Sequence, residues 1–540
     1  MGKKIFRNGN IFTSDEEMPC AESFIADDGI ITWIGKDCDL PESKDDIAGT
    51  DTQVIDLKGR TVIPGFIDSH MHPVILAGYI NSISCLPPEI RSIEELAPAI
   101  RKKAETAGPG EWIKGWGYDE EKFAEHRAPT RWDLDKGSGD VPVCLLRSCT
   151  HVRSVNSKAL ELAGITRDTP DPPGGEIDRD ENGEPTGILR ENAAHLVDDV
   201  MPEISREELI DSIVKLGSLL LSQGVTAVCD MGNLEPTDYY RYYEEAAQKG
   251  FRQSVGIYYM WGQVRDRKDF SWDDERARRD KQIFDAGIKL IGDGSVGGRT
   301  AWMNRPYKGS EDEFGICVCS DDEIDTAIDF CKENRCQLSF HAMGKRTIDK
   351  ITSRAESESP WITDRPHIRL EHVTDPSEEA IEIMAEKKIA VSTQAIFMYS
   401  EIESYVNNLG EDWLHETYPI RHMLEKGVKV ALSTDAPATS WAVPSDPFPN
   451  IKSAVSRYAY DGTDCGRENR IDTETAVKLY TREGAQVAGF EKMGMLKRGF
   501  KADFAVLSED LFSACGEDID KVFVTETYID GEQVYKCITR

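Results

Sequence analysis

The sequence predicts an α/β fold: a (β/α)8 TIM barrel, a small composite β-sandwich domain from both termini, and an inserted domain after the first barrel strand. Three observations lead to this prediction. Eight short apolar segments each end in a polar residue. Stretches with helical periodicity separate most of these segments, and both ends of the chain are rich in strand and turn patterns. Strands that alternate with helices are typical of a parallel sheet, and eight such units fit a barrel.

The amino-terminal segment reads as short strands joined by turns. In KKIFRNGNIFT and SFIADDGIITWIG, an apolar run is interrupted by Asn-Gly or Asp-Gly, which are the dipeptides favoured in β-hairpin turns. The carboxyl-terminal segment returns to this pattern in KADFAVLSED and in KVFVTETYIDGEQVYKC, which contains a further Asp-Gly. We therefore assign residues 1–60 and 486–540 to one composite β domain.

The predicted barrel strands follow one another along the middle of the chain. They are TVIPGFIDSH (61–70), GVTAVCD (224–230), RQSVGIYY (252–259), GIKLIGD (287–293), QLSFH (337–341), HIRLEH (367–372), KIAVSTQ (388–394) and VKVALSTD (428–435). Amphipathic stretches of helical length lie between them, such as SDDEIDTAIDFCKENR and PSEEAIEIMAEKK. In such a barrel the functional residues lie at the carboxyl ends of the strands. The barrel is assigned to residues 61–75 and 206–485.

One interval is too long for a barrel loop and helix. Residues 71–223 separate the first predicted strand from the second. This interval has its own apolar strand, VPVCLLRSC, the aromatic segment EWIKGWGYDEEKF and the turn-rich segment DTPDPPGGEIDRDENGEPTG. We expect residues 76–205 to form an inserted substrate or lid domain.

Composition limits the partners and the compartment. The 540 residues include 64 Lys and Arg against 97 Asp and Glu, a formal charge of −33, so we expect neither nucleic acid nor an anionic membrane as a partner. The 13 cysteines contain no CxxC pair, and the closest two are Cys317 and Cys319, which suggests neither a disulfide framework nor a cysteine zinc site. We find no signal peptide and no long apolar run, and therefore expect a cytoplasmic protein with reduced thiols.

Histidines and an aspartate occupy the ends of several predicted strands. His70 and His72 are two apart at the end of the first strand, where alternate residues point to the same side and both imidazoles can reach one metal ion. The pair alone also fits two structural histidines. However, His341, His372 and Asp435 end three further strands and converge on the barrel axis. Nitrogen and carboxylate ligands favour zinc, with manganese, iron and nickel as alternatives.

The motif PGFIDSHMHP resembles the first-strand motif of the amidohydrolase superfamily of metal-dependent hydrolases. Along nearly the whole chain, further segments resemble successive motifs of its YtcJ-like branch, which includes N-substituted formamide deformylase. These segments are EWIKGWGYDEEKF, HVRSVNSKAL, GGEIDRDENGEPTGILRENA, KLIGDGSVGGRTA, HAMG, RLEH, STDAP and GMLKRGFKADFAVL. The resemblance implies a metallo-barrel with a composite β domain, and His70, His72, His341, His372 and Asp435 as metal-site residues.

Lys289, in GIKLIGDG, is a further candidate for the metal site. The superfamily often carries a carboxylated lysine at this strand, where the carbamate bridges two metal ions. A free ammonium is a poor ligand beside a cation, so this role requires the carbamate. The resemblance therefore implies one or two divalent transition-metal ions, most readily zinc. The alternative is a barrel lysine paired with Asp293 and a site with one metal ion.

Three residues are candidates for substrate binding. His151 lies in HVRSVNSKAL of the inserted domain, where the alternative is a structural histidine in a turn. Asp293 and Arg299 lie in DGSVGGRTA after the fourth barrel strand. Arg299 is suited to hold a substrate carboxylate or carbonyl, and the alternative is a salt bridge that fixes this glycine-rich loop. Lys345 follows HAMG where the family commonly has an acidic residue, so we carry over no single member's substrate.

The expected activity is metal-dependent hydrolysis of a carbon–nitrogen bond in an amide, an N-formyl or N-acyl amine, or a cyclic amide. A metal ion lowers the pKa of a bound water to about 7, and Asp435 would deprotonate this water and then protonate the leaving amine. Deamination of a heterocyclic amine is an alternative, but it usually needs a glutamate near the fifth barrel strand, and HAMGKRTID offers none. A non-catalytic homologue is a third reading, although such proteins typically lose metal ligands. We expect a small-molecule substrate, and a homodimer as the common default.

Overall fold

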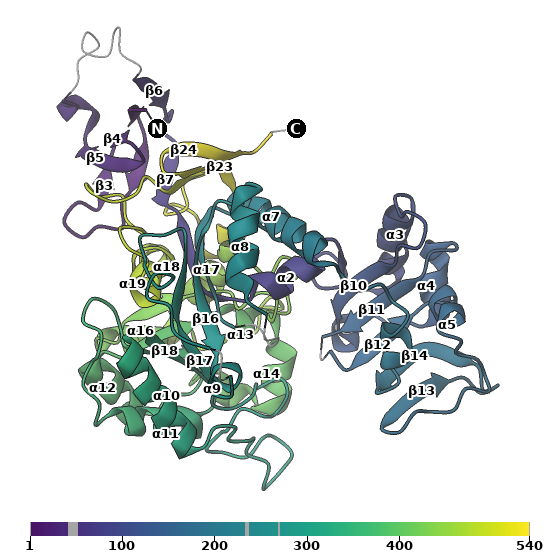
Figure 1. The fold of residues 1–540 in the computed structure, drawn as a ribbon. Helices are drawn as coiled ribbons and strands as arrows, with labels where there is room; N and C mark the ends of the chain where they lie inside the picture. Colours follow the sequence, from purple (N-terminus) through teal and green to yellow (C-terminus); the bar gives the residue numbers. More distant parts are fainter. Residues whose placement is uncertain (1, 42–51, 149, 233–236, 268–269, 539–540) are drawn as a thin grey trace. The chain divides into compact units, whose positions relative to one another are not determined.

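Each of the eight segments predicted as barrel strands contains a strand of one parallel sheet in the computed structural model (Figure 1). The first segment divides, because Thr61–Pro64 forms a strand of the terminal β-sandwich and only the part from Phe66 onward belongs to the barrel. In sheet order they are β8 (Phe66–Met71), β15 (Val225–Asp230), β16 (Ser254–Met260), β17 (Ile283–Ile291), β18 (Gln337–Ala342), β19 (Ile368–His372), β20 (Ala390–Thr393) and β21 (Val430–Leu432). The two ends of the sheet meet where the backbone N–H of Asp435 donates to the carbonyl of His70 at 2.8 Å. The nearly closed sheet confirms the predicted (β/α)8 barrel.

The structure describes residues 2–41, 52–148, 150–232, 237–267 and 270–538. It consists of two units. The first comprises Met1–Val74, Ile213–Thr439 and Ser445–Arg540, and the second comprises Ile75–Ser212 and Ser440–Pro444. Among the described residues, every helix is too short or too polar to cross a lipid bilayer.

Helices follow the barrel strands where the sequence has amphipathic periodicity. Ser320 and Glu323 form a capping box at the start of α10, and Ser377 caps α12, which satisfies backbone N–H groups that have no partner within the helix. The helices of the first unit are α8 (Tyr239–Gln248), α9 (Trp261–Arg265), α10 (Asp321–Asn334), α11 (Lys345–Ala355), α12 (Glu378–Lys387), α13 (Ile396–Ser400), α14 (Ile402–Asn408), α15 (Glu411–Leu414), α16 (Ile420–Glu425), α17 (Pro447–Ser456), α18 (Thr473–Tyr480) and α19 (Arg482–Ala488).

Both ends of the chain contribute strands to one β-sandwich. One sheet has the order β24-β23-β22-β7-β2-β3 and the other has the order β5-β4-β1-β6. A shared apolar core joins the sheets, in which the Phe6 ring lies 4.6 Å from that of Phe24 and 5.0 Å from that of Phe504. This arrangement confirms the predicted composite domain. Its strands are β1 (Lys4–Arg7), β2 (Asn10–Phe12), β3 (Cys20–Ala21), β4 (Ser23–Asp27), β5 (Ile30–Gly35), β6 (Gln53–Asp56), β7 (Thr61–Pro64), β22 (Phe504–Leu507), β23 (Val524–Ile529) and β24 (Glu532–Lys536).

One expected hairpin is wrong. The Asp-Gly turns join β4 to β5 and β23 to β24 as antiparallel pairs, but β1 and β2, on either side of Asn8-Gly9, belong to different sheets. Asn8 adopts a left-handed φ of 57°, and the N–H of Gly9 donates to the carbonyl of Glu22. The dipeptide therefore turns the chain from one sheet into the other and does not close a hairpin.

The second unit is built on a six-stranded mixed sheet with the order β13-β14-β12-β11-β10-β9. The strands β9, β10 and β11 are parallel, whereas β12, β14 and β13 add antiparallel pairs. The main part of this unit, Ile75–Ser212, falls between β8 and β15 in sequence, as expected of an inserted domain, and the short segment Ser440–Pro444 joins it from after β21. Its elements are β9 (Ile83–Ser84), α3 (Ile93–Ala104), β10 (Ile113–Tyr118), α4 (Arg131–Ser138), β11 (Val143–Arg147), β12 (Val152–Val155), α5 (Ser157–Leu162), β13 (Gly175–Arg179), β14 (Pro185–Glu191) and α6 (His195–Asp198), with α2 (Pro73–Tyr79) and α7 (Arg206–Ser222) at its two junctions.

Candidate metal centre

Three buried residues bring ligand atoms together at the carboxyl end of the barrel. His70, His372 and Asp435 each offer one nitrogen or oxygen atom, and these atoms lie within 4.8 Å of one another. His70 belongs to β8, His372 ends β19, and Asp435 follows β21. Two imidazoles and a carboxylate are donors that suit zinc and related divalent ions.

The Asp435 carboxylate lies between imidazoles. Its Oδ1 atom is 3.3 Å from Nε2 of His70 and 3.2 Å from Nε2 of His72, and its Oδ2 atom is 3.9 Å from Nδ1 of His372. Although burial opposes ionisation, the surrounding imidazoles hold the pKa of Asp435 well below its usual value. Among the described residues, the buried Oδ1 atom accepts no hydrogen bond. A cation held by these groups would satisfy that oxygen.

The buried Glu371 carboxylate fixes the orientation of His70. Nδ1 of His70 lies 2.6 Å from Oε2 of Glu371, which leaves Nε2 directed at Asp435. Glu371 also accepts hydrogen bonds from Arg369 Nε at 2.5 Å and from Ser339 Oγ at 2.6 Å, and both Arg369 and Glu371 are 0% exposed. A carboxylate behind a histidine selects the ring tautomer and raises its basicity as a ligand.

The other three histidines are also held by oxygen atoms. Nδ1 of His72 lies 3.1 Å from the carbonyl of Gly232, Nε2 of His341 lies 2.8 Å from the carbonyl of Gly294, and Nδ1 of His372 lies 2.7 Å from Oε1 of Gln394. Burial lowers the pKa values of His341 and His372, so both rings are neutral near pH 7. Their ring centroids are 4.5 Å apart, and the His70 ring is 4.9 Å from that of His372. Neutral imidazoles are the form that binds metal ions.

Lys289 is buried in β17 beside this cluster. Its residue is 2% exposed, and within the described ranges its Nζ atom makes no hydrogen bond. Burial lowers the pKa of Lys289 to about 8, although Glu371 and Asp435 act in the opposite direction. The structure does not pair it with Asp293, which was the alternative. A buried amine that makes no hydrogen bond is suited to carry an attached group that would make those contacts.

The backbone is unusual at two of the candidate ligands. His372 has a φ of 73°, and Asp435 has a φ of 58°. Left-handed backbone is uncommon for residues other than glycine and gathers at functional sites. The buried Asp68 supports this geometry, because its carboxylate accepts hydrogen bonds from Thr434 Oγ1 at 2.5 Å and from the N–H of His70 at 3.2 Å. Asp68 thus ties the loop before Asp435 to β8.

Asp293, predicted to bind substrate, accepts hydrogen bonds from three backbone N–H groups, and its role in substrate binding stays a prediction. Its Oδ1 atom accepts from the N–H of Met343 at 3.0 Å, and its Oδ2 atom accepts from Gly344 at 2.8 Å and Trp302 at 2.9 Å. Gly344 approaches Trp302 so closely that a Cβ atom would lie 2.3 Å from the Trp302 carbonyl oxygen. Oδ1 also lies 3.6 Å from Nε2 of His341. The structure therefore brings Asp293 to the edge of the histidine cluster.

The other two predicted substrate residues have partners outside the cluster. Arg299 binds Glu313 with an N–O distance of 2.6 Å and covers the ring of Tyr307 at 5.2 Å. His151 belongs to the second unit, where its side chain is 64% exposed and Nδ1 lies 3.1 Å from Oε2 of Glu191. Their roles in substrate binding stay predictions.

Sequence reasoning missed the residues behind the metal centre. Arg369 and Glu371 were part of the quoted motif HIRLEH, but only its last histidine was selected. The available signal was two charged residues at alternate positions of a strand otherwise expected to be buried. Lys345 was noted, and its Nζ atom lies 3.1 Å from Oδ1 of the buried Asp375.

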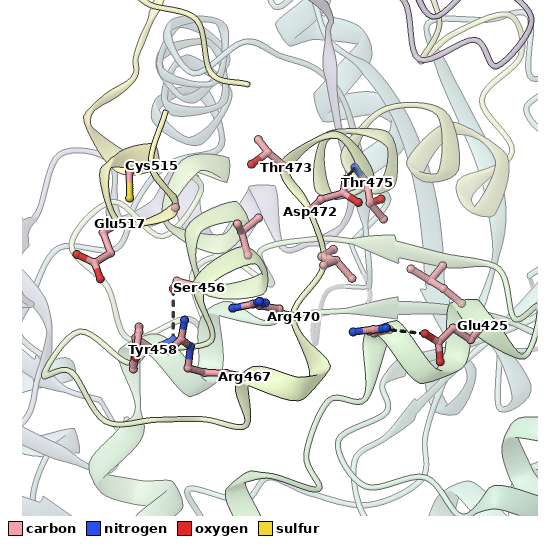
Figure 2. A pocket seen from close by; sticks show the side chains of 15 residues that line it. Glu425, Ser456, Tyr458, Arg467, Arg470, Asp472, Thr473, Thr475, Cys515 and Glu517 are labelled. Carbon is pink, nitrogen blue, oxygen red and sulfur yellow. Dashed lines mark hydrogen bonds and ion pairs between the residues drawn. The ribbon is translucent and has the colours of Figure 1, made fainter. Parts of the chain in front are cut away.

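The first unit also contains a cavity of about 730 Å³, whose lining side chains are drawn in Figure 2. It is lined by parts of α16, α17 and α18 and by the segments that follow α17 and precede α18. Arg421 pairs with Glu425 there, and Arg467 covers the ring of Tyr458. The lining includes none of the predicted site residues, so this cavity is not the metal centre.

Comparisons with known proteins agree with the barrel fold and with the resemblance found in the sequence. The model of a family described as the amidohydrolase family matches residues 53–535. The putative amidohydrolase YtcJ of Bacillus subtilis (strain 168) is 29% identical over 548 residues, covering 99% of both chains. N-substituted formamide deformylase of Arthrobacter pascens is 27% identical over 540 residues, covering 98% of this chain and 97% of the other. A crystal structure of an uncharacterized metal-dependent hydrolase from Pyrococcus horikoshii OT3 aligns with a TM-score of 0.72 and 26% identity, covering 95% of this chain and 99% of that chain.

Proposed function

Because this chain belongs to the amidohydrolase family and is a metal-dependent hydrolase of carbon–nitrogen bonds, we propose that its reaction takes place at the centre formed by His70, His72, His341, His372 and Asp435. One observation supports this assignment most strongly. The Asp435 carboxylate is surrounded by imidazoles, yet its buried Oδ1 atom accepts no hydrogen bond from any described residue. We propose zinc as the ion, because neutral imidazole and carboxylate ligands suit it.

Glu371 and Asp435 have separate roles in the proposed reaction. A divalent ion at this centre supplies Lewis acidity and lowers the pKa of water to about 7. Glu371 keeps His70 oriented through its 2.6 Å contact with Nδ1. Asp435, whose pKa is held low by the imidazoles against the effect of burial, is ionised and accepts the proton of the attacking water. The same carboxyl group then returns the proton to the leaving amine nitrogen.

Lys289 is proposed to complete the centre as a carbamate. Its buried amine has a pKa of about 8, so a substantial neutral fraction near that pH is available to combine with carbon dioxide. The product replaces a buried cation with an anionic ligand beside the histidines. In Lys289→Met the side chain keeps its volume but cannot be carboxylated, and we expect loss of one metal ion per chain with loss of turnover. Unchanged metal content and rate in this variant would show that the carbamate is absent.

The substrate class is proposed to be an N-formyl or N-acyl amine or a cyclic amide. The support is the likeness to N-substituted formamide deformylase along 98% of this chain. The experiment is a panel of N-substituted formamides, N-acyl amines and cyclic amides, in which release of the amine or opening of the ring is followed directly. Heterocyclic amines that would release ammonia form the comparison arm. Turnover confined to that arm would replace amide hydrolysis with deamination.

A further inference from the structure

The partner of His372 is an amide, whereas the partner of His70 is the carboxylate of Glu371. Nδ1 of His372 lies 2.7 Å from Oε1 of Gln394, which follows β20 and is 0% exposed. The same nitrogen is 3.9 Å from Oδ2 of Asp435, a distance too long for a hydrogen bond. Gln394 is therefore the hydrogen-bond partner of Nδ1.

The direction of this hydrogen bond decides which nitrogen of His372 can bind a metal ion. A neutral imidazole carries one N–H group and one lone pair, on different nitrogens. When the amide oxygen faces the ring, Nδ1 carries the proton and Nε2 keeps the lone pair. When the amide NH2 group faces the ring, it uses the lone pair of Nδ1 and the proton lies on Nε2. An ionised carboxylate such as Glu371 only accepts, but an amide has both possibilities.

The other side of the Gln394 amide contacts Ser433, which follows β21. Nε2 of Gln394 donates to Oγ of Ser433 at 2.8 Å. The Ser433 hydroxyl has two further partners, Oγ of Ser392 at 2.9 Å and the carbonyl oxygen of Thr393 at 3.5 Å. Either partner can accept the single Ser433 hydrogen, so the Ser433 oxygen is free to accept from the amide NH2 group. This contact turns the amide oxygen towards His372.

The contacts of Ser433 continue as a buried chain to the first barrel strand. Oγ of Ser392, in β20, lies 2.8 Å from Oγ of Ser69, in β8. Ser69, Ser392 and Ser433 are each 0% exposed, so bulk water does not compete for their hydroxyl groups. Ser69 directly precedes His70 in the sequence. The chain of side chains therefore joins the strands of two candidate metal ligands, and it holds the Gln394 amide between them.

We propose that Gln394 is a positioning residue of the metal centre, which accepts the Nδ1 proton of His372 and keeps the lone pair of Nε2 available to a metal ion. This inference rests on the proposed function, because it concerns a ligand of the proposed centre. A neutral amide suits this place, since the centre already contains the buried carboxylates of Glu371 and Asp435. A third buried negative charge would repel both of them.

The first test reads the tautomer of His372 directly. The full-length protein is produced with isotope-labelled histidine, freed of metal with a chelator and studied by nuclear magnetic resonance, in which a protonated ring nitrogen and one with a lone pair have different chemical shifts. The variant His372→Gln identifies the His372 signals by their loss. We expect the proton on Nδ1 in the wild type and a changed or mixed tautomer in Gln394→Leu. A wild-type protein with the proton on Nε2 would overturn the proposal.

The second test measures zinc affinity by competition with a chelator, which requires no turnover. We expect Gln394→Leu to bind zinc about 10- to 100-fold more weakly than the wild type, because Nδ1 loses its acceptor. Gln394→Glu should restore most of this affinity, since a carboxylate also accepts the Nδ1 proton. Equal affinities in the wild type and Gln394→Leu would overturn the proposal. A wild-type protein that binds no metal would instead contradict the proposed function.

Gln337 provides the matched control, because it is a second buried amide of the same barrel. It is 1% exposed in β18, and its Nε2 atom donates to the carbonyls of Pro366 at 2.6 Å and Val487 at 3.0 Å. Gln337→Leu should keep the wild-type zinc affinity, and far-ultraviolet circular dichroism checks that each variant is folded. If Gln337→Leu weakens zinc binding as much as Gln394→Leu does, the effect is a general consequence of losing a buried amide and Gln394 does not position His372.

Discussion

At the scale of single residues, the account depends on the carboxylate of Asp435, which lies among imidazoles and has one oxygen that accepts no hydrogen bond from the described residues. The imidazoles of His70 and His72 approach its Oδ1 atom, and the same oxygen has no hydrogen-bond donor among the described residues. Asp435→Asn keeps the shape of the side chain but removes its ability to accept a proton. We expect kcat to fall by about 100-fold or more, while the histidines still retain most of the metal. Elemental analysis beside steady-state kinetics measures both quantities, and a wild-type rate in the variant would exclude Asp435 as the base.

Glu371 acts through His70 and therefore predicts a different pattern. In Glu371→Gln the amide no longer provides two anionic oxygens for Arg369, Ser339 and His70. We expect metal affinity to fall by about 10- to 100-fold, and activity to recover as metal is added in excess. The measurement is a metal titration against activity.

A second His–Glu pair provides the control for this prediction. Oε2 of Glu378 lies 2.7 Å from Nε2 of His422, but both side chains are exposed. Glu378→Gln should leave metal affinity unchanged. If Glu371→Gln behaves in the same way as this surface variant, Glu371 does not position a ligand.

At the scale of elements, the positions of the strands were easier to predict from the sequence than the strands and residues that lie beside them. The barrel strands were found from sequence because each is a short segment rich in apolar residues, as expected for strands buried on both faces. The prediction of a hairpin at Asn8-Gly9 was wrong because a dipeptide specifies a turn but does not specify the strand with which the next segment pairs. Glu371 was missed for a related reason: its contact with His70 joins residues that are 301 positions apart. Such a pair becomes visible only when β8 and β19 are placed in one barrel.

In the composite β domain, Asp503 lies immediately before β22 and should make the stability of the protein depend on pH. Burial raises the pKa of Asp503 to about 6, although Lys501 acts in the opposite direction. Because the folded protein binds this proton more tightly than the unfolded chain, Asp503 contributes stability below about pH 4, and that contribution is lost as the pH rises to about 6. Asp503→Asn mimics the protonated form, and its oxygen still accepts from the N–H of Asp530.

We therefore expect Asp503→Asn to match the wild type in acid and to be more stable by roughly 2–3 kcal/mol at neutral pH. Thermal unfolding of both proteins across this pH range measures the difference. Asp27→Asn, at an exposed position of β4 in the same domain, controls for the loss of one negative charge. A stability difference that does not change with pH would contradict the assignment of a raised pKa.

At the scale of the whole molecule, the net charge of the protein does not indicate the charge at its proposed catalytic centre. The formal charge of −33 is distributed over a chain whose proposed metal centre combines histidines, of which burial keeps His341 and His372 neutral, with the carboxylate of Asp435. The charge therefore says nothing about the sign of the substrate, which depends on the groups around the barrel mouth. Lys345 illustrates this point, because its ammonium is already paired with the buried Asp375 at 3.1 Å.

Family and fold were accessible from sequence because they depend on ordered motifs along the entire chain, and the family model matches residues 53–535. The positions of Asp293 and Arg299 were less accessible. Both were correctly placed after a barrel strand, but the partners of Asp293, the N–H groups of Met343 and Gly344, come from the loop after β18, and the partner of Arg299, Glu313, lies 14 residues further along the same loop. Loop contacts of this kind follow from the assembled barrel rather than from local spacing.

The central claim is that a metal ion at the histidine–aspartate centre is required for hydrolysis of a carbon–nitrogen bond. Its most direct test is amine release from N-formyl and N-acyl amines by the protein as purified, after removal of metal with a chelator, and after return of zinc. Elemental analysis and circular dichroism accompany each state. We expect one or two transition-metal ions per chain at first, loss of activity without loss of fold after chelation, and recovery with zinc. A folded, metal-free protein that retains full activity would contradict the claim.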